Sequence, residues 1–122
     1  MRKQRMTSNE ILKNAVKILD GKKAEQLTAI KIKDLTILAE YFIIASGNSN
    51  TQVRAMADEV EFKLGEMGLR PYKVEGYQTA NWIVLDYLDV VIHIFQTQTR
   101  EFYSLERLWS DGEMVDMDAL LK

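Results

Sequence analysis

His93 is the only histidine in this chain of 122 residues, and it lies within an apolar run at positions 90–95. An imidazole could serve as a general base or as a metal ligand. A general base would need a nucleophile and an orienting group beside it, and no spacing in the chain identifies either one. A usual zinc site would need several further ligands, and the chain has no cysteine. We expect His93 to be structural, hydrogen-bonded to Asp86, Tyr103 or backbone.

Two other groups of residues could serve nucleotide chemistry. The turn at 47–49, Gly-Asn-Ser, follows a predicted strand and precedes a predicted helix, where backbone N–H groups can hold an anion. Nucleotidyl transfer also needs paired carboxylates that hold Mg²⁺. Glu59 and Glu61 are two apart on the helix and therefore point about 200° apart, while Asp86 and Asp89 flank a turn without a glycine-rich phosphate loop. We interpret the turn as a helix cap and predict no enzyme activity, no metal and no cofactor.

Aromatic side chains gather in the last third of the chain, at Trp82, Tyr87, Phe102, Tyr103 and Trp109. Phe102 and Trp109 have helical spacing, which is typical of a core position. Trp82 begins a strand beside a polar loop and Tyr87 lies in a turn, so both are predicted to be partly exposed. Exposed tryptophan and tyrosine beside charged residues are typical of protein interfaces. Nucleic-acid bases could stack on the same rings, but the lysines and arginines are scattered rather than clustered.

The charge of the chain favours a protein partner over nucleic acid. Its formal net charge is −2, which argues against a general phosphate-binding surface. A mildly acidic protein can still approach a ribonucleoprotein if it binds a basic protein within it.

Length and composition predict one domain over residues 1–122, with a short extension at 1–6 and an acidic tail at 110–122. We expect the tail to be solvated. No apolar run approaches the ~20 residues of a membrane helix, and no signal-peptide pattern opens the chain. Together with the absence of cysteine, this predicts a cytoplasmic protein.

The elements that would position these residues follow from apolar periodicity. The patterns predict helices at 11–21, 50–67 and 100–109, and strands at 27–35, 41–45, 72–75, 82–85 and 90–95. This order predicts an α/β fold with a mixed five-stranded sheet flanked by helices. The strands at 41–45 and 72–75 should be parallel, and the last two strands should form an antiparallel hairpin.

Local signals mark the ends of the first two helices. Ser8 or Asn9 could cap the first helix. Ser49 and Gln52 have the spacing of a capping box for the second, which Gly68 should end.

Several motifs, taken in order, resemble the ribosomal silencing factor family, whose members are also called Iojap-like proteins. Downstream these motifs are Glu75-Gly76, Trp82-Ile-Val-Leu-Asp86, Asp89-Val-Val-Ile-His93-Ile-Phe95, Arg100 and Tyr103-Ser-Leu-Glu-Arg-Leu-Trp109. Upstream they are Asp34-Leu-Thr, Tyr41-Phe-Ile-Ile-Ala-Ser-Gly47 and the segment 49–58. The resemblance covers about residues 11–109, which is nearly the whole chain.

This resemblance implies a nucleotidyltransferase-like α-β-α arrangement and a function without catalysis. Family members bind large-subunit ribosomal protein fourteen on the intersubunit face of the large ribosomal subunit. They thereby block joining of the small subunit and lower translation when nutrients are scarce, and they often form homodimers when free. The resemblance places a protein-binding patch on Trp82, Asp86, Tyr87, His93, Arg100 and Tyr103, with Trp82 as its anchor and Asp86 facing basic groups. A nucleotidyltransferase-type enzyme and a homodimeric adaptor unrelated to ribosomes remain as alternatives.

The chain departs from the family pattern at Leu88, where members often have glycine. A type I′ turn would need positive φ there, which leucine resists. We therefore expect the turn to have shifted to a type I form with ordinary dihedral angles.

Overall fold

A computed structural model describes residues 6–32, 39–103 and 112–121, with residues 101–103 as backbone only. Its elements are α1 (Ser8–Gly21), β1 (Glu25–Lys31), β2 (Tyr41–Gly47), α2 (Asn50–Glu66), β3 (Lys73–Glu75), β4 (Trp82–Asp86), β5 (Val90–Gln96), α3 (Thr97–Tyr103), β6 (Glu113–Met114) and α5 (Met117–Leu121). Within the described residues the predicted elements are present, with small changes at their ends, while residues 104–109 of the last predicted helix lie outside them.

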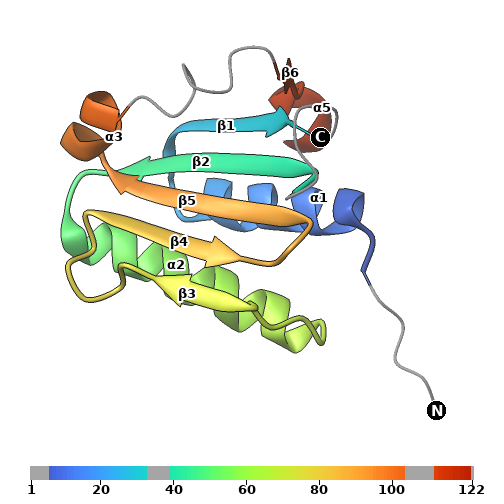
Figure 1. The fold of residues 1–122 in the computed structure, drawn as a ribbon, viewed down its shortest axis with the longest axis horizontal. Coiled ribbons are helices and arrows are strands. Elements are labelled where there is room, and N and C mark those ends of the chain that lie inside the picture. Colours follow the sequence, from blue (N-terminus) through green and yellow to red (C-terminus); the bar gives the residue numbers. More distant parts are fainter. Residues whose placement is uncertain (1–5, 33–38, 104–111, 122) are drawn as a thin grey trace.

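The strands form one mixed sheet in the order β3-β4-β5-β2-β1-β6 (Figure 1). β2 pairs with β5 in parallel, and every other neighbouring pair is antiparallel. The α/β class and the mixed sheet flanked by helices are confirmed. Six strands are described where we expected five, because the tail contributes β6. β3 does run parallel to β2, as predicted, although β4 and β5 lie between them.

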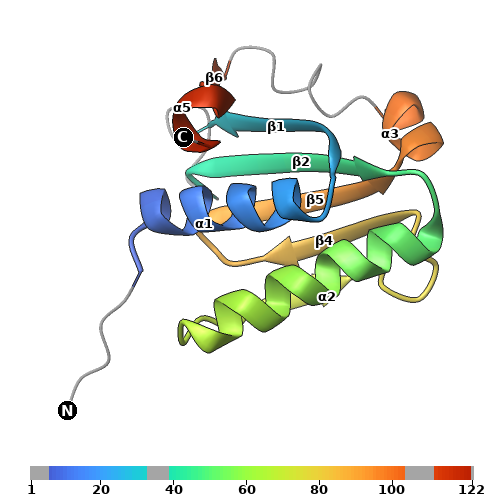
Figure 2. The same cartoon turned by 180° about the vertical axis from the view of Figure 1, so that it is seen from behind.

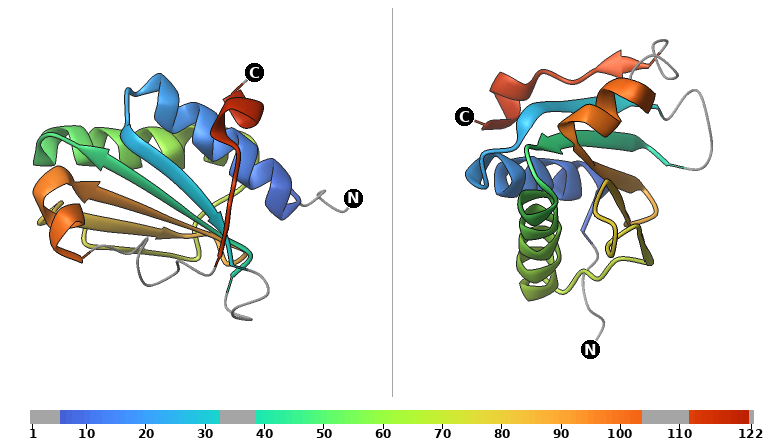
Figure 3. Two further views of the ribbon diagram at one scale, coloured as in Figure 1. Left: turned by 90° about the horizontal axis from the view of Figure 1, so that it is seen from above. Right: turned by 90° about the vertical axis from the view of Figure 1, so that its left-hand side faces the viewer.

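Both long helices cover the same face of the sheet, as Figures 2 and 3 show. Their apolar sides pack with alternate residues of the central strands to form the main core. The fully buried positions include Leu12, Leu19, Val53, Met56, Val60, Leu64, Ile43, Ile83, Leu85, Ile92 and Ile94. In the described part of the chain, the other face of the sheet carries no comparable helix; we call it the second face.

Each long helix begins with a hydrogen-bonded cap. Thr7 caps α1: its Oγ1 accepts from Glu10 N at 3.1 Å, and the Glu10 carboxylate accepts from Thr7 N at 2.8 Å. The expected cap at Ser8 or Asn9 is wrong by one or two positions. Ser49 caps α2 as predicted, since its hydroxyl accepts from Gln52 N at 3.1 Å.

The acidic tail packs against the fold. Val115 N donates to Ala29 O at 2.9 Å, which continues the pairing of β6 with β1. Met117, Leu120 and Leu121 of the tail are partly buried against the main core. The expectation of a solvated tail is therefore wrong, because four apolar residues among the acidic ones, Val115 included, dock it beside α1 and β1 (Figure 1).

The predicted helix at 100–109 begins earlier than expected, at Thr97. Trp109 and the end of the predicted strand at 27–35 lie outside the described residues. In the residues that the structure describes, no helix is both long and apolar enough to cross a membrane.

Candidate functional site

The register of three strands gathers several of the predicted site residues on the second face. β4 presents Trp82, Val84 and Asp86 there, paired with Phe95, His93 and Val91 of β5. β2 extends these cross-strand rows of side chains, because Ile44 pairs with His93 and Phe42 pairs with Val91. Trp82, Val84, Asp86, Phe42 and Val91 are all half-buried, and we call these five residues the Trp82 patch.

His93 lies at the centre of these rows and is only 6% exposed. Its Nδ1 accepts a hydrogen bond from Trp82 Nε1 at 3.0 Å. An indole nitrogen can only donate, so Nδ1 is unprotonated and the neutral imidazole carries its proton on Nε2. Nε2 is buried and has no hydrogen-bond partner among the described residues. Among the described residues, the hydrogen-bond partner of His93 is therefore Trp82 rather than Asp86 or backbone, while the side chain of Tyr103 lies outside them.

Burial controls the protonation of His93. Desolvation lowers its pKa from 6.5 to about 4, because the charged imidazolium loses its hydration between the apolar rows. Phe42 meets the ring edge to face, with ring centroids 4.8 Å apart. His93 is therefore neutral at pH 7 and remains an acceptor for the Trp82 N–H.

Trp82 is held from two sides. Its indole stacks on Phe95, with ring centroids 4.9 Å apart and ring planes 23° apart, and its N–H is fixed by His93. The side chain remains partly exposed, which confirms the prediction made from its place beside a polar loop. A fixed and partly exposed indole loses little conformational entropy when a partner binds, which suits an interface anchor.

Asp86 shapes the turn that follows β4. Its Oδ1 accepts from Leu88 N at 2.8 Å, and Leu88 has a φ of +71° with its side chain 56% exposed. The expected turn with ordinary dihedral angles is therefore wrong: this hairpin holds Leu88 in the left-handed region. Asp86 shares the second face with Trp82 and brings a negative charge to the end of the Trp82 patch.

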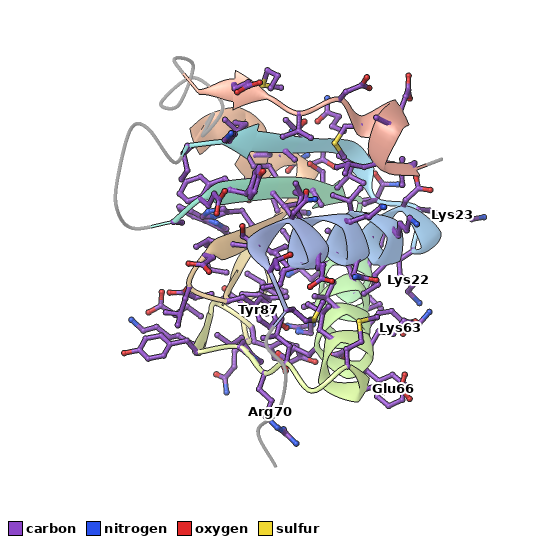
Figure 4. The ribbon with its side chains drawn as sticks, turned by 90° about the vertical axis from the view of Figure 1, so that its right-hand side faces the viewer. Lys22, Lys23, Lys63, Glu66, Arg70 and Tyr87 are labelled. Atoms are coloured by element: carbon purple, nitrogen blue, oxygen red, sulfur yellow. The ribbon has the colours of Figure 1, made fainter. Side chains whose placement is uncertain are left out.

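Tyr87 points away from this surface. It is 4% exposed and belongs to the main core, so the prediction of a partly exposed Tyr87 is wrong. In Figure 4 it lies within the body of the protein, whereas Lys22 and Lys63 project outward. Burial, and secondarily the charge of Glu61, raises the pKa of the Tyr87 hydroxyl. A turn residue can direct its side chain to either face of the sheet. Burying the large apolar surface of an aromatic ring in the core is the more favourable of the two.

Arg100 is also buried, at 5% exposure. Its guanidinium donates to Ser46 Oγ at 2.8 Å and to Thr28 Oγ1 at 3.2 Å, which ties α3 to β2 and β1. Its expected place in a surface patch is therefore wrong. The side chain of Tyr103, the sixth predicted site residue, lies outside the described residues.

The turn after β2 is joined to the start of α2 by two hydrogen bonds. Asn48 N donates to the Gln52 side chain at 2.7 Å, and Gln52 N donates to Ser49 Oγ. A Cβ on Gly47 would lie 2.9 Å from Cε at the flexible end of Met56, so the turn packs closely against α2. Within the described ranges, no three histidine, aspartate or glutamate residues come together as a metal site would require.

The three apolar members of the Trp82 patch were missed from the sequence. Phe42, Val84 and Val91 stand in apolar runs that look buried on both sides. The alternation of Trp82, Val84 and Asp86 along one strand was the available signal, since it places all three on a single face.

Comparison with known proteins finds relatives along almost the whole chain. Residues 5–122 match the family described as "Ribosomal silencing factor during starvation". The chain is similar to Ribosomal silencing factor RsfS of Halalkalibacterium halodurans, with 39% identity over 116 residues that cover 95% of this chain and 99% of that protein. It is also similar to Ribosomal silencing factor RsfS of Bacillus subtilis, with 39% identity over 113 residues that cover 93% and 96% of the two chains.

The fold has a counterpart among solved structures. A crystal structure of a Chromobacterium violaceum protein superposes with a TM-score of 0.84 at 35% identity, covering 86% of this chain and 88% of that one. The resemblance inferred from the ordered motifs is thus confirmed by sequence and by structure. The chain belongs to the ribosomal silencing factor family.

Proposed function

We propose that this protein represses translation by binding large-subunit ribosomal protein fourteen on the large ribosomal subunit and blocking the small subunit from joining. It acts in the cytoplasm, through shape and bulk rather than catalysis, and it is a homodimer when free. Membership in a family of silencing factors supports a role at the ribosome during starvation. The named ribosomal protein comes from the family resemblance.

The observation that carries the proposal is the half-buried Trp82 fixed on the second face by His93 and Phe95. Around it, Phe42, Val84 and Val91 are partly exposed apolar residues. Such a surface, with a fixed tryptophan at one end and a carboxylate at the other, has the composition of a protein interface.

Charge supports a basic protein as the partner. Asp86 is the only charged residue of the Trp82 patch, and the chain as a whole is acidic. Electrostatic attraction would steer the protein toward a basic surface and orient it there. Of the predicted site residues, Trp82 and Asp86 would touch the partner, whereas His93 would act through Trp82.

The test is sedimentation of the purified protein with separated ribosomal subunits. We expect it to sediment with large subunits and not with small ones. Trp82→Ala should lose this binding, while Tyr72→Ala, which removes an exposed aromatic ring elsewhere, should retain it. Equal sedimentation with both subunits, or unchanged binding by Trp82→Ala, would overturn the proposal.

A further inference from the structure

The loop at 76–81 connects β3 to β4 and ends directly before Trp82. It runs beside the first turns of α2, as Figures 1 and 2 show. Asn50, Arg54 and Asp58 of α2 follow each other at intervals of four residues and therefore share one side of the helix. All three form hydrogen bonds with the loop, so one side of α2 fixes the approach of the chain to Trp82.

Arg54 is at the centre of this attachment. Its Nε donates to Tyr77 O at 3.1 Å, and one of its terminal nitrogens donates to Gln78 O. The guanidinium also lies over the Tyr77 ring, 5.9 Å from the ring centroid. A guanidinium can donate to two neighbouring carbonyls at once because its N–H groups form a rigid fork, whereas a lysine ammonium is a single compact charge. Arg54 thus holds two consecutive carbonyls of the loop in one orientation.

Contacts on either side of Arg54 complete the attachment. Asn50 Nδ2 donates to Thr79 O at 2.8 Å, and the Tyr77 hydroxyl donates to Asp58 Oδ2 at 3.1 Å. Carbonyls of three successive loop residues therefore accept hydrogen bonds from side chains of α2. Arg54 alone supplies two of these bonds, so its removal should release more of the loop than the loss of either neighbour.

The loop carries an unfavourable backbone conformation two residues before Trp82. Ala80 has a φ of +58°, and its side chain is fully buried in the main core. This conformation is unfavourable for a residue with a Cβ and persists where surrounding contacts hold it. Thr79, the residue before Ala80, is bound to α2 through its carbonyl. The attachment to α2 therefore helps to keep the loop in the path that leads to Trp82.

Both ends of the loop meet the backbone near Trp82. Gly76 has a φ of +81°, and a Cβ there would lie 2.1 Å from Trp82 O. At the other end, Asn81 O accepts from Gln96 N at 2.9 Å, which joins the loop to the end of β5. A change in the path of the loop must therefore displace the backbone from which the Trp82 indole extends.

We propose that Arg54 is a positioning residue for Trp82. By holding the loop against α2, it fixes the start of β4, so that the indole reaches both His93 and Phe95. The effect on the indole is a property of the protein alone. Its consequence, that a misplaced Trp82 binds large subunits less well, rests on the proposed function.

The first measurement is hydrogen exchange of the Trp82 indole N–H in the full chain, followed by NMR, with Trp82→Phe identifying the signal. Arg54→Met keeps a long side chain and removes the donors. Exchange should become about tenfold faster, because the bond to His93 opens more often when the start of β4 is not held. Arg54→Lys keeps one donor group and should lie between Arg54→Met and the parent.

Arg70→Met is the matched control, because it removes the same group from an exposed position after α2, and it should leave the indole exchange unchanged. The backbone N–H groups of β5, which has a strand on each side, report global unfolding in the same experiment. An arginine that only stabilises the fold would change both rates alike. The indole rate should instead rise relative to the rates of β5.

The second measurement is affinity for large subunits at a temperature where every variant is folded. Arg54→Met should weaken binding about threefold to tenfold, as expected when one side chain must be ordered again at an interface. Arg70→Met should bind like the parent.

The two measurements separate the two proposals. An indole that exchanges in Arg54→Met as slowly as in the parent, or only in step with β5, would overturn the role of Arg54. A parent chain that fails to bind large subunits would overturn the proposed function, and the indole exchange would still decide the role of Arg54. Faster indole exchange with unchanged affinity would support the positioning and contradict Trp82 as the anchor of the interface.

Discussion

Trp82 Nε1 donates a hydrogen bond to Nδ1 of His93, 3.0 Å away, across the β4–β5 pair. The bond assigns the imidazole proton to Nε2 and fixes the edge of the indole, while Phe95 stacks on its face. A buried histidine and a partly exposed tryptophan thus form one unit, in which His93 sets the orientation of the Trp82 indole.

Trp82→Ala should weaken binding to large subunits by roughly 2 kcal/mol or more, because a fixed aromatic anchor typically carries much of an interface's free energy. Binding should be measured together with thermal unfolding. A core tryptophan would instead cost ~3–5 kcal/mol of folding stability when truncated. A strongly lowered melting temperature with unchanged affinity would show that Trp82 acts as a core residue and not as an interface anchor.

The stability of the fold should fall as the pH drops from about 6.5 to about 4. The pKa of His93 is about 4 in the folded protein and 6.5 when hydrated, so between these values the unfolded chain binds the additional proton. This loss of folding stability is absent above pH 6.5, grows as the pH falls and levels off below pH 4, at roughly 3 kcal/mol. The measurement is chemical denaturation across this range.

His93→Phe is the matched control for this pH dependence, because it keeps a ring and removes the titrating group. Carboxylates titrate in both proteins, so their effects cancel in the difference in unfolding free energy between parent and variant. This difference should therefore change between pH 6.5 and pH 4 because of His93 alone. A constant difference would show that His93 does not carry the effect.

Leu88→Gly should raise the free energy of unfolding, by a few tenths of ~1 kcal/mol at least. Leu88 has a φ of +71°, which glycine adopts without the steric cost that a Cβ imposes, although glycine also gains entropy in the unfolded chain. The comparison is with Leu88→Ala, which keeps a Cβ and should bring no such gain. A glycine variant less stable than the alanine variant would contradict this account of the turn.

Tyr87→Phe should leave stability unchanged or raise it by up to ~1 kcal/mol. The Tyr87 hydroxyl is buried and has no hydrogen-bond partner among the described residues, so its removal ends a desolvation cost. Tyr87→Ala should lose ~3–5 kcal/mol, because it empties a core position. Neither variant should bind large subunits differently at a temperature where it is folded. Weaker binding of folded Tyr87→Phe to large subunits would show that Tyr87 does belong to the binding site.

Much of the fold could be predicted because its elements carry local signals. Apolar periodicity marks the helices and strands, and Ser49 with Gly68 marks the ends of α2. The docked tail was not predicted, because the few apolar residues that hold it stand among acidic ones and find their partners far away in the chain.

The candidate site was predicted less well, because it depends on tertiary contacts. Trp82 is partly exposed, as its place beside a polar loop predicts, and Asp86 lies on the same face of β4. The burial of Arg100 depends on Ser46 and Thr28, which lie 54 and 72 residues away. The side chain of Tyr87 was free to turn to either face, and only the packing of the main core decided which.

Subunit joining tests the central proposal most directly. Large subunits are first incubated with saturating protein, small subunits are then added, and light scattering follows the formation of joined ribosomes. We expect the parent protein to reduce joining, Trp82→Ala to reduce it far less, and Tyr72→Ala to act like the parent. Undiminished joining at saturating parent protein, or equal inhibition by Trp82→Ala, would contradict the account.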